Sequence, residues 1–138
     1  MGKNIVKTKR PELTGLEGAV MSVVWDLGEC GSREVIGAFR ARTRRPLADT
    51  TIRTVLANLR KKGYVVPVPT IERGMRLRPA VERSGVARRS LRQLIARFFG
   101  GSPSQAMAYL IQNETIPDEE IENLRRMIQA IRKARKLK

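Results

Sequence analysis

Apolar residues recur at helical spacing in two stretches near the start of the chain. In the first stretch, the positions on one face of a 3.6-residue period are Leu16, Val20, Val23, Val24 and Leu27. Thr14 and Glu17 have the spacing of a capping box and Gly28 follows the last apolar position, so a helix is predicted between them. After the Gly31-Ser32 turn, a second and shorter helix is predicted on the stripe Val35, Ile36 and Phe39.

The third helical pattern is the clearest. Its apolar positions, spaced i, i+3, i+4 and i+7, are Ile52, Val55, Leu56 and Leu59. The predicted helix begins at Asp49-Thr50-Thr51, and Gly63 ends it. Its opposite face carries Thr50, Arg53, Thr54, Ala57, Asn58 and Lys61. Short hydroxyl side chains let a helix lie deep in the major groove of DNA, while Arg and Asn reach base edges or phosphate. A solvated helix face shows the same pattern, so periodicity leaves both interpretations open.

Two extended segments follow this helix. The β-branched segment 64–69 contains two prolines, which restricts it to an edge strand or an extended segment. Arg73-Gly74 is typical of a turn, and the segment 75–78 alternates apolar and charged residues as a half-buried strand does. Three helices followed by two strands around a basic tip is the order of a winged helix. In that fold Arg73 and Arg76 could contact phosphate or could serve solubility alone.

From about Glu82 onward the pattern predicts helices only. The first ends at Gly100-Gly101, a short one begins at Ser102-Pro103, and the last runs from about Pro117 to the C-terminus. These helices bury little by themselves, so we expect them to form a dimer, although folding back onto the winged helix is the alternative. The predicted dimerisation residues are Leu91, Leu94, Phe98, Met107, Leu110, Ile121, Leu124, Ile128 and Ile131.

Composition narrows the class of protein. The chain carries 28 Lys and Arg against 13 Asp and Glu, a net charge of +15 that favours a polyanionic partner. It has no His and a single Cys30, and no glycine-rich phosphate loop occurs, so we expect neither an enzyme nor a bound metal or cofactor. The acidic residues of 118–122 are explained by the dipole at the start of a helix. No secretion signal or membrane-spanning run is found, which predicts a cytoplasmic protein.

These observations predict a mainly α chain, an α+β winged helix followed by a helical region. We expect a disordered basic arm over 1–12, a DNA-binding winged helix over 13–80 and a dimerisation domain over 81–138. The candidate DNA contacts are Thr50, Thr51, Arg53, Thr54, Asn58, Lys61, Arg44, Arg45, Arg73 and Arg76.

The succession of motifs resembles the penicillinase repressors of the BlaI/MecI type. The segments that carry the resemblance are Leu13-Thr14 with Glu17, Met21, Val24-Trp25, Arg33-Glu34-Val35, the residues of 47–56 and 59–65, Arg78-Pro79-Ala80-Val81, Gly101-Ser102-Pro103, and the residues of 121–125. They extend in order over nearly all of 13–131. The resemblance rests on this succession rather than on one motif.

The resemblance implies a homodimeric winged-helix repressor that binds a palindromic operator with inverted TACA and TGTA half-sites. The third helix would lie in the major groove, with Thr50, Thr51, Arg53 and Thr54 at the DNA-contacting positions. Family members are commonly released by proteolysis in the dimerisation region, triggered by a transmembrane sensor-protease. Here Tyr109-Leu110 replaces the Asn-Phe pair that is cut in the best-known members. Copper-responsive relatives have a Cys-rich C-terminus, whereas no Cys follows Cys30 in this chain.

Two other functions remain open from the sequence. A basic RNA-binding or nucleoid-coating protein needs the net charge but no sequence specificity. A winged helix can also serve protein interaction and bind no nucleic acid.

Overall fold

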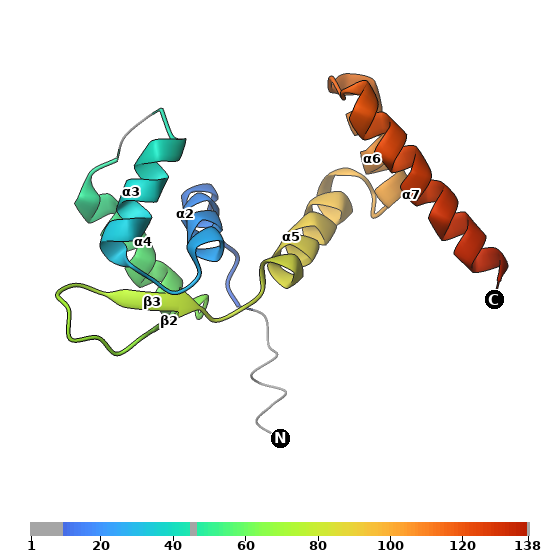
Figure 1. Cartoon of the computed structure of the whole chain (residues 1–138). Helices are drawn as coiled ribbons and strands as arrows, with labels where there is room; N and C mark the ends of the chain where they lie inside the picture. Colours follow the sequence, from blue (N-terminus) through green and yellow to red (C-terminus); the bar gives the residue numbers. More distant parts are fainter. Residues whose placement is uncertain (1–9, 45–46, 138) are drawn as a thin grey trace. The chain divides into compact units, whose positions relative to one another are not determined.

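The computed structural model describes residues 10–44 and 47–137. The predicted arm over 1–12 therefore falls largely outside the described residues, as do Arg45 and Pro46. Two compact units, residues up to Ser90 and residues from Leu91 onward, are each considered by themselves. Figure 1 shows the helices α2, α3 and α4 above the β2–β3 hairpin, and the helices α5, α6 and α7 that follow along the chain.

The first helix, α2 (Gly15–Leu27), confirms the predicted capping box. The Glu17 amide donates to the Thr14 hydroxyl over 3.1 Å, and the Thr14 amide donates to the Glu17 carboxylate over 2.9 Å. Gly28 ends the helix with φ 75°, which favours glycine. The predicted apolar face was wrong at both ends, because Leu16 and Leu27 are exposed. Met21 is instead fully buried beside Val20, since the core covers a wider arc in the middle of the helix.

The helices α3 (Ser32–Arg42) and α4 (Asp49–Lys61) follow, as predicted. The apolar stripe of α4 is buried at Ile52, Val55, Leu56 and Leu59. At its C-terminal end Gly63 has φ 84°, which again favours glycine. Residues of α2, α3, α4 and the sheet form one hydrophobic core within the first unit.

The described residues contain a three-stranded antiparallel sheet in the order β1-β3-β2. The strands are β1 (Cys30–Gly31), β2 (Val65–Pro67) and β3 (Arg76–Pro79). The predicted edge position of the proline-containing segment is confirmed by β2, whereas β1 was not predicted. Pro79 is tolerated in the central strand because β1 pairs with β3 only at Leu77 and Arg76. With β1 between α2 and α3, this order of helices and strands is that of a winged helix.

The remaining helices are α5 (Arg83–Phe98), α6 (Pro103–Asn113) and α7 (Asp118–Lys136). Gly100 and Gly101 have φ 58° and 82°, as a chain reversal between helices requires. The Ser102 hydroxyl caps α6 by accepting from the Gln105 amide over 3.2 Å, with Pro103 in the first turn. The predicted mainly α class with a winged helix is thus confirmed.

Candidate nucleic-acid interface

The exposed face of α4 lies opposite its buried stripe. Thr50, Thr51, Arg53 and Thr54 are exposed, and Asn58 is half-buried one turn further on. The four exposed residues occupy the first two turns, and the apolar residues between them hold the helix against the core. The sequence therefore places short polar side chains and one guanidinium on a rigid, solvent-facing helix.

The two central residues of this face differ in what they can offer a ligand. The Thr54 hydroxyl donates to the Thr50 carbonyl over 2.9 Å, so it presents a methyl group and an acceptor oxygen to solvent. Among the described residues, the Arg53 side chain has no hydrogen-bond or ion-pair partner. Its guanidinium is free to form a bidentate contact, which suits a guanine edge or a phosphate.

Arg40 at the end of α3 secures the entry to α4, a role that sequence reasoning missed. Its guanidinium forms an ion pair with Asp49 and donates to the Leu47 carbonyl over 3.3 Å. The Asp49 carboxylate complements the dipole of α4, and Arg40 offsets its charge beside the exposed threonines. No local signal predicts this contact, because nothing in the spacing shows how the loop between the helices folds.

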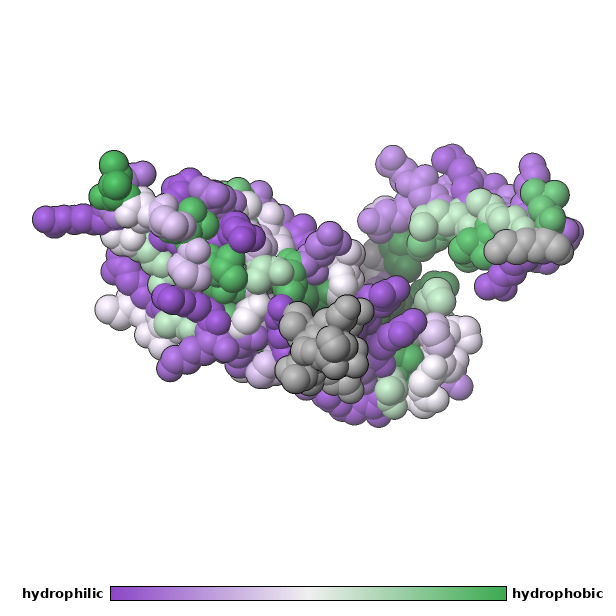
Figure 2. All heavy atoms as spheres, turned by 90° about the horizontal axis from the view of Figure 1, so that it is seen from below, coloured by the Kyte–Doolittle hydropathy of each residue, from purple (hydrophilic) through white to green (hydrophobic). Residues whose placement is uncertain are grey.

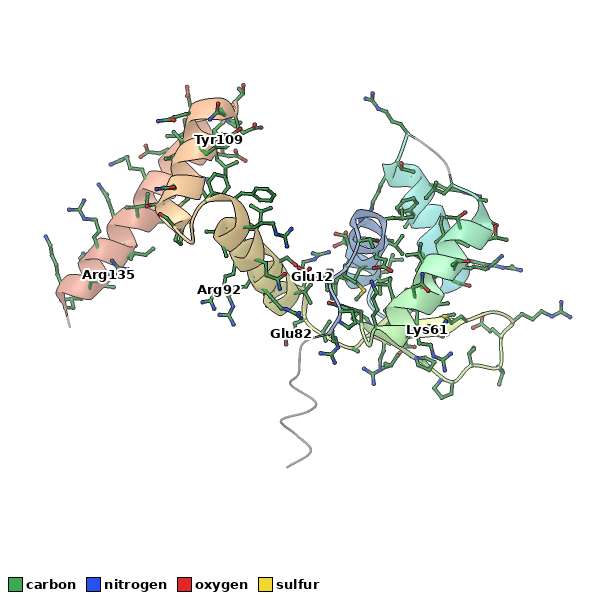
Figure 3. The ribbon with its side chains drawn as sticks, turned by 180° about the vertical axis from the view of Figure 1, so that it is seen from behind. Glu12, Lys61, Glu82, Arg92, Tyr109 and Arg135 are labelled. Atoms are coloured by element: carbon green, nitrogen blue, oxygen red, sulfur yellow. The ribbon has the colours of Figure 1, made fainter. Side chains whose placement is uncertain are left out.

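The basic residues around α4 lie at both of its ends. Arg44 is exposed in the loop before the helix, while Arg45 lies outside the described residues. Lys61 is exposed at the C-terminal end of α4 (Figure 3). The exposed face is therefore flanked by cations, the charge that a phosphate backbone requires.

The two wing arginines have different surroundings. Arg73 is exposed at the wing tip. Arg76 in β3 pairs with Glu29 through an Nε–Oε2 distance of 3.0 Å, and its Nη1 lies 3.8 Å from a Glu34 carboxylate oxygen. A phosphate would have to compete with these carboxylates for Arg76, whereas Arg73 is accessible.

An ion pair between α2 and Lys62, the residue that follows α4, also holds α4 in place. Lys62 Nζ lies 2.6 Å from Glu17 Oε1, and the two side chains are 24% and 7% exposed. Hydrogen bonding from Lys62, and then from the Thr14 amide, lowers the pKa of Glu17. This buried carboxylate is stabilised in its charged form by groups on two separate segments.

We predict that Lys62→Met lowers the free energy of unfolding by about 1–3 kcal/mol, because Glu17 loses its charged partner. Since the pKa of Glu17 is lowered on folding, its contribution is present above the unfolded pKa of about 4.3 and is lost as the pH falls. Urea titrations at several pH values between neutral and acidic measure the slope of the free energy of unfolding against pH. Glu17→Gln should make the slope shallower, and an unchanged slope would contradict the assignment.

Most of the large apolar side chains of the second unit are exposed. All nine predicted dimerisation residues are exposed in the single chain, with Phe98 on α5 at 67%. In Figure 2 the part at the upper right shows hydrophilic residues along its upper edge and hydrophobic residues below them. Tyr109 and Met127 are also exposed apolar residues. Met127 could have been predicted, because it lies at helical spacing from Leu124 and Ile131.

One aromatic contact within this unit joins the residue that follows α5 to α6. The rings of Phe99 and Tyr109 lie 5.7 Å apart between centroids, at an interplanar angle of 59°. Figure 3 shows Tyr109 on α6, the helix in which the Tyr109-Leu110 peptide bond lies. That bond is therefore part of a regular helix rather than of an extended segment.

Other candidate chemistry is limited. Cys30 is buried in the core, and burial raises the pKa of its thiol, which disfavours the reactive thiolate. Within residues 10–44 and 47–137, no group of three or more His, Cys, Asp or Glu could hold a metal ion. No helix in these ranges is both long and apolar enough to cross a membrane.

Comparison with known proteins identifies the family to which the chain belongs. The model of the penicillinase repressor family matches residues 13–130. An uncharacterized 16.5 kDa protein in the ptsI 3' region of Latilactobacillus sakei is 31% identical over 124 residues, which are 86% of this chain and 80% of that protein.

Solved structures of similar arrangement have low identity to the chain. Wild-type MarR from E. coli, in its apo form, is 13% identical, with a TM-score of 0.48 over 86% of this chain and 78% of that one. FabT of Streptococcus pneumoniae, solved in complex with DNA, is 20% identical, with a TM-score of 0.46 over 98% of this chain and 85% of that one. The winged helix seen in the chain itself and the family match agree: this protein belongs to the penicillinase repressor family of DNA-binding transcriptional repressors.

Proposed function

We propose that the protein represses transcription as a homodimer that binds a palindromic operator, with α4 of each protomer in the major groove. The observation that carries this proposal is the exposed face of α4. Thr50, Thr51, Arg53 and Thr54 face solvent on a helix whose other side is buried in the core. Short side chains permit close approach to base edges, and Arg53 supplies a bidentate donor.

The uncovered apolar residues of α5, α6 and α7 support the dimer. Their exposure would be costly in a monomer, because each large apolar side chain gains about 1.5–3 kcal/mol when it leaves water. A second copy presents the same faces and can cover them with two-fold symmetry. The two copies of α4, which we call the reading helices, then match the inverted half-sites that the family resemblance implies.

The other DNA contacts are assigned by position. Thr50, Thr51 and Thr54 would meet bases, and Arg44, Arg45, Asn58, Lys61 and Arg73 would hold the phosphate backbone around them. Arg76 is the least suited of the candidate residues to this role, because Glu29 and Glu34 already engage it.

Release of the repressor by proteolysis or another signal stays a prediction, as does a sensor-protease partner. Tyr109 and Leu110 lie inside α6, so cleavage between them requires that α6 first unfold locally.

We predict that Arg53→Ala weakens operator binding by about 1–3 kcal/mol and relaxes the preference at one base pair. The measurement is fluorescence anisotropy with the operator that the wild-type protein selects from a random duplex library. The matched control is Arg132→Ala, which removes the same charge from an exposed site on α7. Equal weakening on all sequences would make Arg53 a phosphate contact, and an effect no larger than that of Arg132→Ala would contradict any direct contact.

A non-specific nucleic-acid-binding protein remains the main alternative, because the net charge of +15 suffices for it. Mobility shifts at physiological salt with operator and scrambled duplexes separate the two functions. A specific repressor favours its site by about a thousandfold or more. Equal affinities would contradict the proposed function.

A further inference from the structure

Three consecutive backbone carbonyls, in the segment 10–12, each accept a hydrogen bond from a different part of the first unit. We name this segment the strap. Arg89 of α5 donates to the Arg10 carbonyl over 2.9 Å, and the Tyr64 hydroxyl donates to the Pro11 carbonyl over 2.8 Å. Lys62 donates to the Glu12 carbonyl over 2.9 Å. The strap thus connects the end of the reading helix to the helix that leads toward the dimerisation region.

The strap also donates a hydrogen bond to the turn that ends α4. The Arg10 side chain donates from Nε to the Gly63 carbonyl over 2.8 Å, at the turn that ends α4. A Cβ added at Gly63 would lie 3.2 Å from Arg10 Nε, so the strap approaches this turn closely. Figure 3 labels Glu12 in the strap and Glu82, the residue before α5. Lys62 is shared with Glu17, so the strap, α2 and the end of α4 are held at one point.

The first half of α5 has a second attachment near its start. Arg83 donates to the Ser22 carbonyl over 3.0 Å and pairs with Asp26 at 2.5 Å, while its guanidinium lies 5.6 Å from the Trp25 ring centroid. Trp25 Nε1 donates to the Val81 carbonyl over 2.9 Å. With Arg83 attached to α2 and Arg89 to the strap, two points fix the direction of this half of α5.

The Arg89 contact is poorly explained by stability alone. Its Nε is buried without a hydrogen-bond partner among the described residues, and a buried unsatisfied donor destabilises a protein. Its one hydrogen bond to the strap goes to a backbone carbonyl, that of Arg10. The contact therefore leaves a buried donor unsatisfied, a cost that a hydrophobic residue at position 89 would avoid.

We propose that the strap and Arg89 are positioning elements, which fix the angle between α4 and the first half of α5, up to Ser90, and thereby favour one spacing between the two half-sites. The inference rests on the proposed function, because spacing has meaning only for a dimer on a palindrome. When the angle is fixed, the second half-site is reached without further ordering of the protein, and its effective concentration is highest at one spacing. When the angle can vary, the effective concentration of the second half-site is lower at that spacing and similar at several others.

The test compares Arg89→Met with wild type on four duplexes: the selected operator, a single half-site, and operators with one base pair added or removed between the half-sites. Met keeps an unbranched stem but has no donor. We expect Arg89→Met to bind the native operator about tenfold more weakly and to lose its preference over the altered spacings, with unchanged half-site affinity. The chain offers a matched control in Arg88→Met, which removes the same charge from an exposed neighbour on α5.

Two further measurements distinguish a loss of positioning from a loss of folding or of dimerisation. Thermal unfolding and sedimentation should show that Arg89→Met is folded and dimeric, and Arg89→Lys, which retains a donor for the Arg10 carbonyl, should restore the spacing preference. If wild type favours the operator but Arg89→Met behaves like Arg88→Met, the strap proposal is overturned while the repressor function stands. If wild type itself does not distinguish operator from scrambled DNA, the proposed function fails, and the strap proposal with it.

Discussion

Truncation after Ser90 is expected to lower operator affinity by at least about 100-fold while leaving the winged helix folded. The truncated chain keeps the whole core of the first unit, together with the attachments of Arg83 and Arg89. It loses α6, α7 and the exposed apolar residues of α5, so each reading helix would bind its half-site alone. Linking two sites raises overall affinity by about 10²–10⁴ without any new contact, and this advantage disappears in the monomer. Anisotropy titrations and circular dichroism measure binding and folding separately.

A single substitution in the full chain tests the same point without removing a segment. Ile128 is exposed on the seam of α7, and Ile128→Glu would place a charge inside the proposed dimer interface. Gln129→Glu is the matched control, because it adds the same charge at the next position, off the seam. Sedimentation should show a monomer for the first variant and a dimer for the second. A dimeric Ile128→Glu variant with unchanged operator affinity would refute this interface.

The reading helix could be predicted from the sequence because all its determinants are local. The apolar period of α4, the acidic residue at its start and Gly63 at its end all lie within 15 residues. Its exposed face was predicted by the same period, because a buried stripe leaves the opposite side to solvent. The family, on which the proposed role of this face rests, was predicted from the succession of motifs along the whole chain.

Contacts between distant segments could not be predicted in this way. The two residues of β1 have no alternation to recognise, and they form a strand only because β3 pairs with them. Arg76 was assigned to the wing surface from its alternation, but its partner Glu29 is 47 residues away. Pairing at such separations depends on tertiary packing, which periodicity does not report.

The predicted core of the first helix shows the same limit within one element. Periodicity placed Leu16 and Leu27 in the buried stripe, yet the packing of α3, α4 and β3 against α2 covers only its middle turns. Met21 lies beside that stripe and is buried, because the neighbouring elements surround it. A period therefore gives the direction of a buried face, whereas its width and length depend on the neighbours.

We expect Leu56→Ala to lower the free energy of unfolding by about 2–5 kcal/mol, the range for a leucine removed from a close-packed core. Leu56 is fully buried in the middle of α4, where it contributes to the same core as α2 and β3. Chemical denaturation with an unchanged dependence on denaturant would identify the loss as one of stability. Thr51→Ala is the control on the exposed side of the same helix, and its effect should stay within about 0.5 kcal/mol.

Measuring stability and base preference together should distinguish substitutions on the buried face of α4 from those on its exposed face. At a temperature where Leu56→Ala remains folded, its base preference should match that of wild type, because no exposed side chain has changed. Arg53→Ala should show the reverse, with wild-type unfolding and altered base preference. A Leu56→Ala variant that loses less than about 1 kcal/mol would contradict the packing of the core. A folded Leu56→Ala variant with altered base preference would instead mean that the exposed face is not fixed by the core alone.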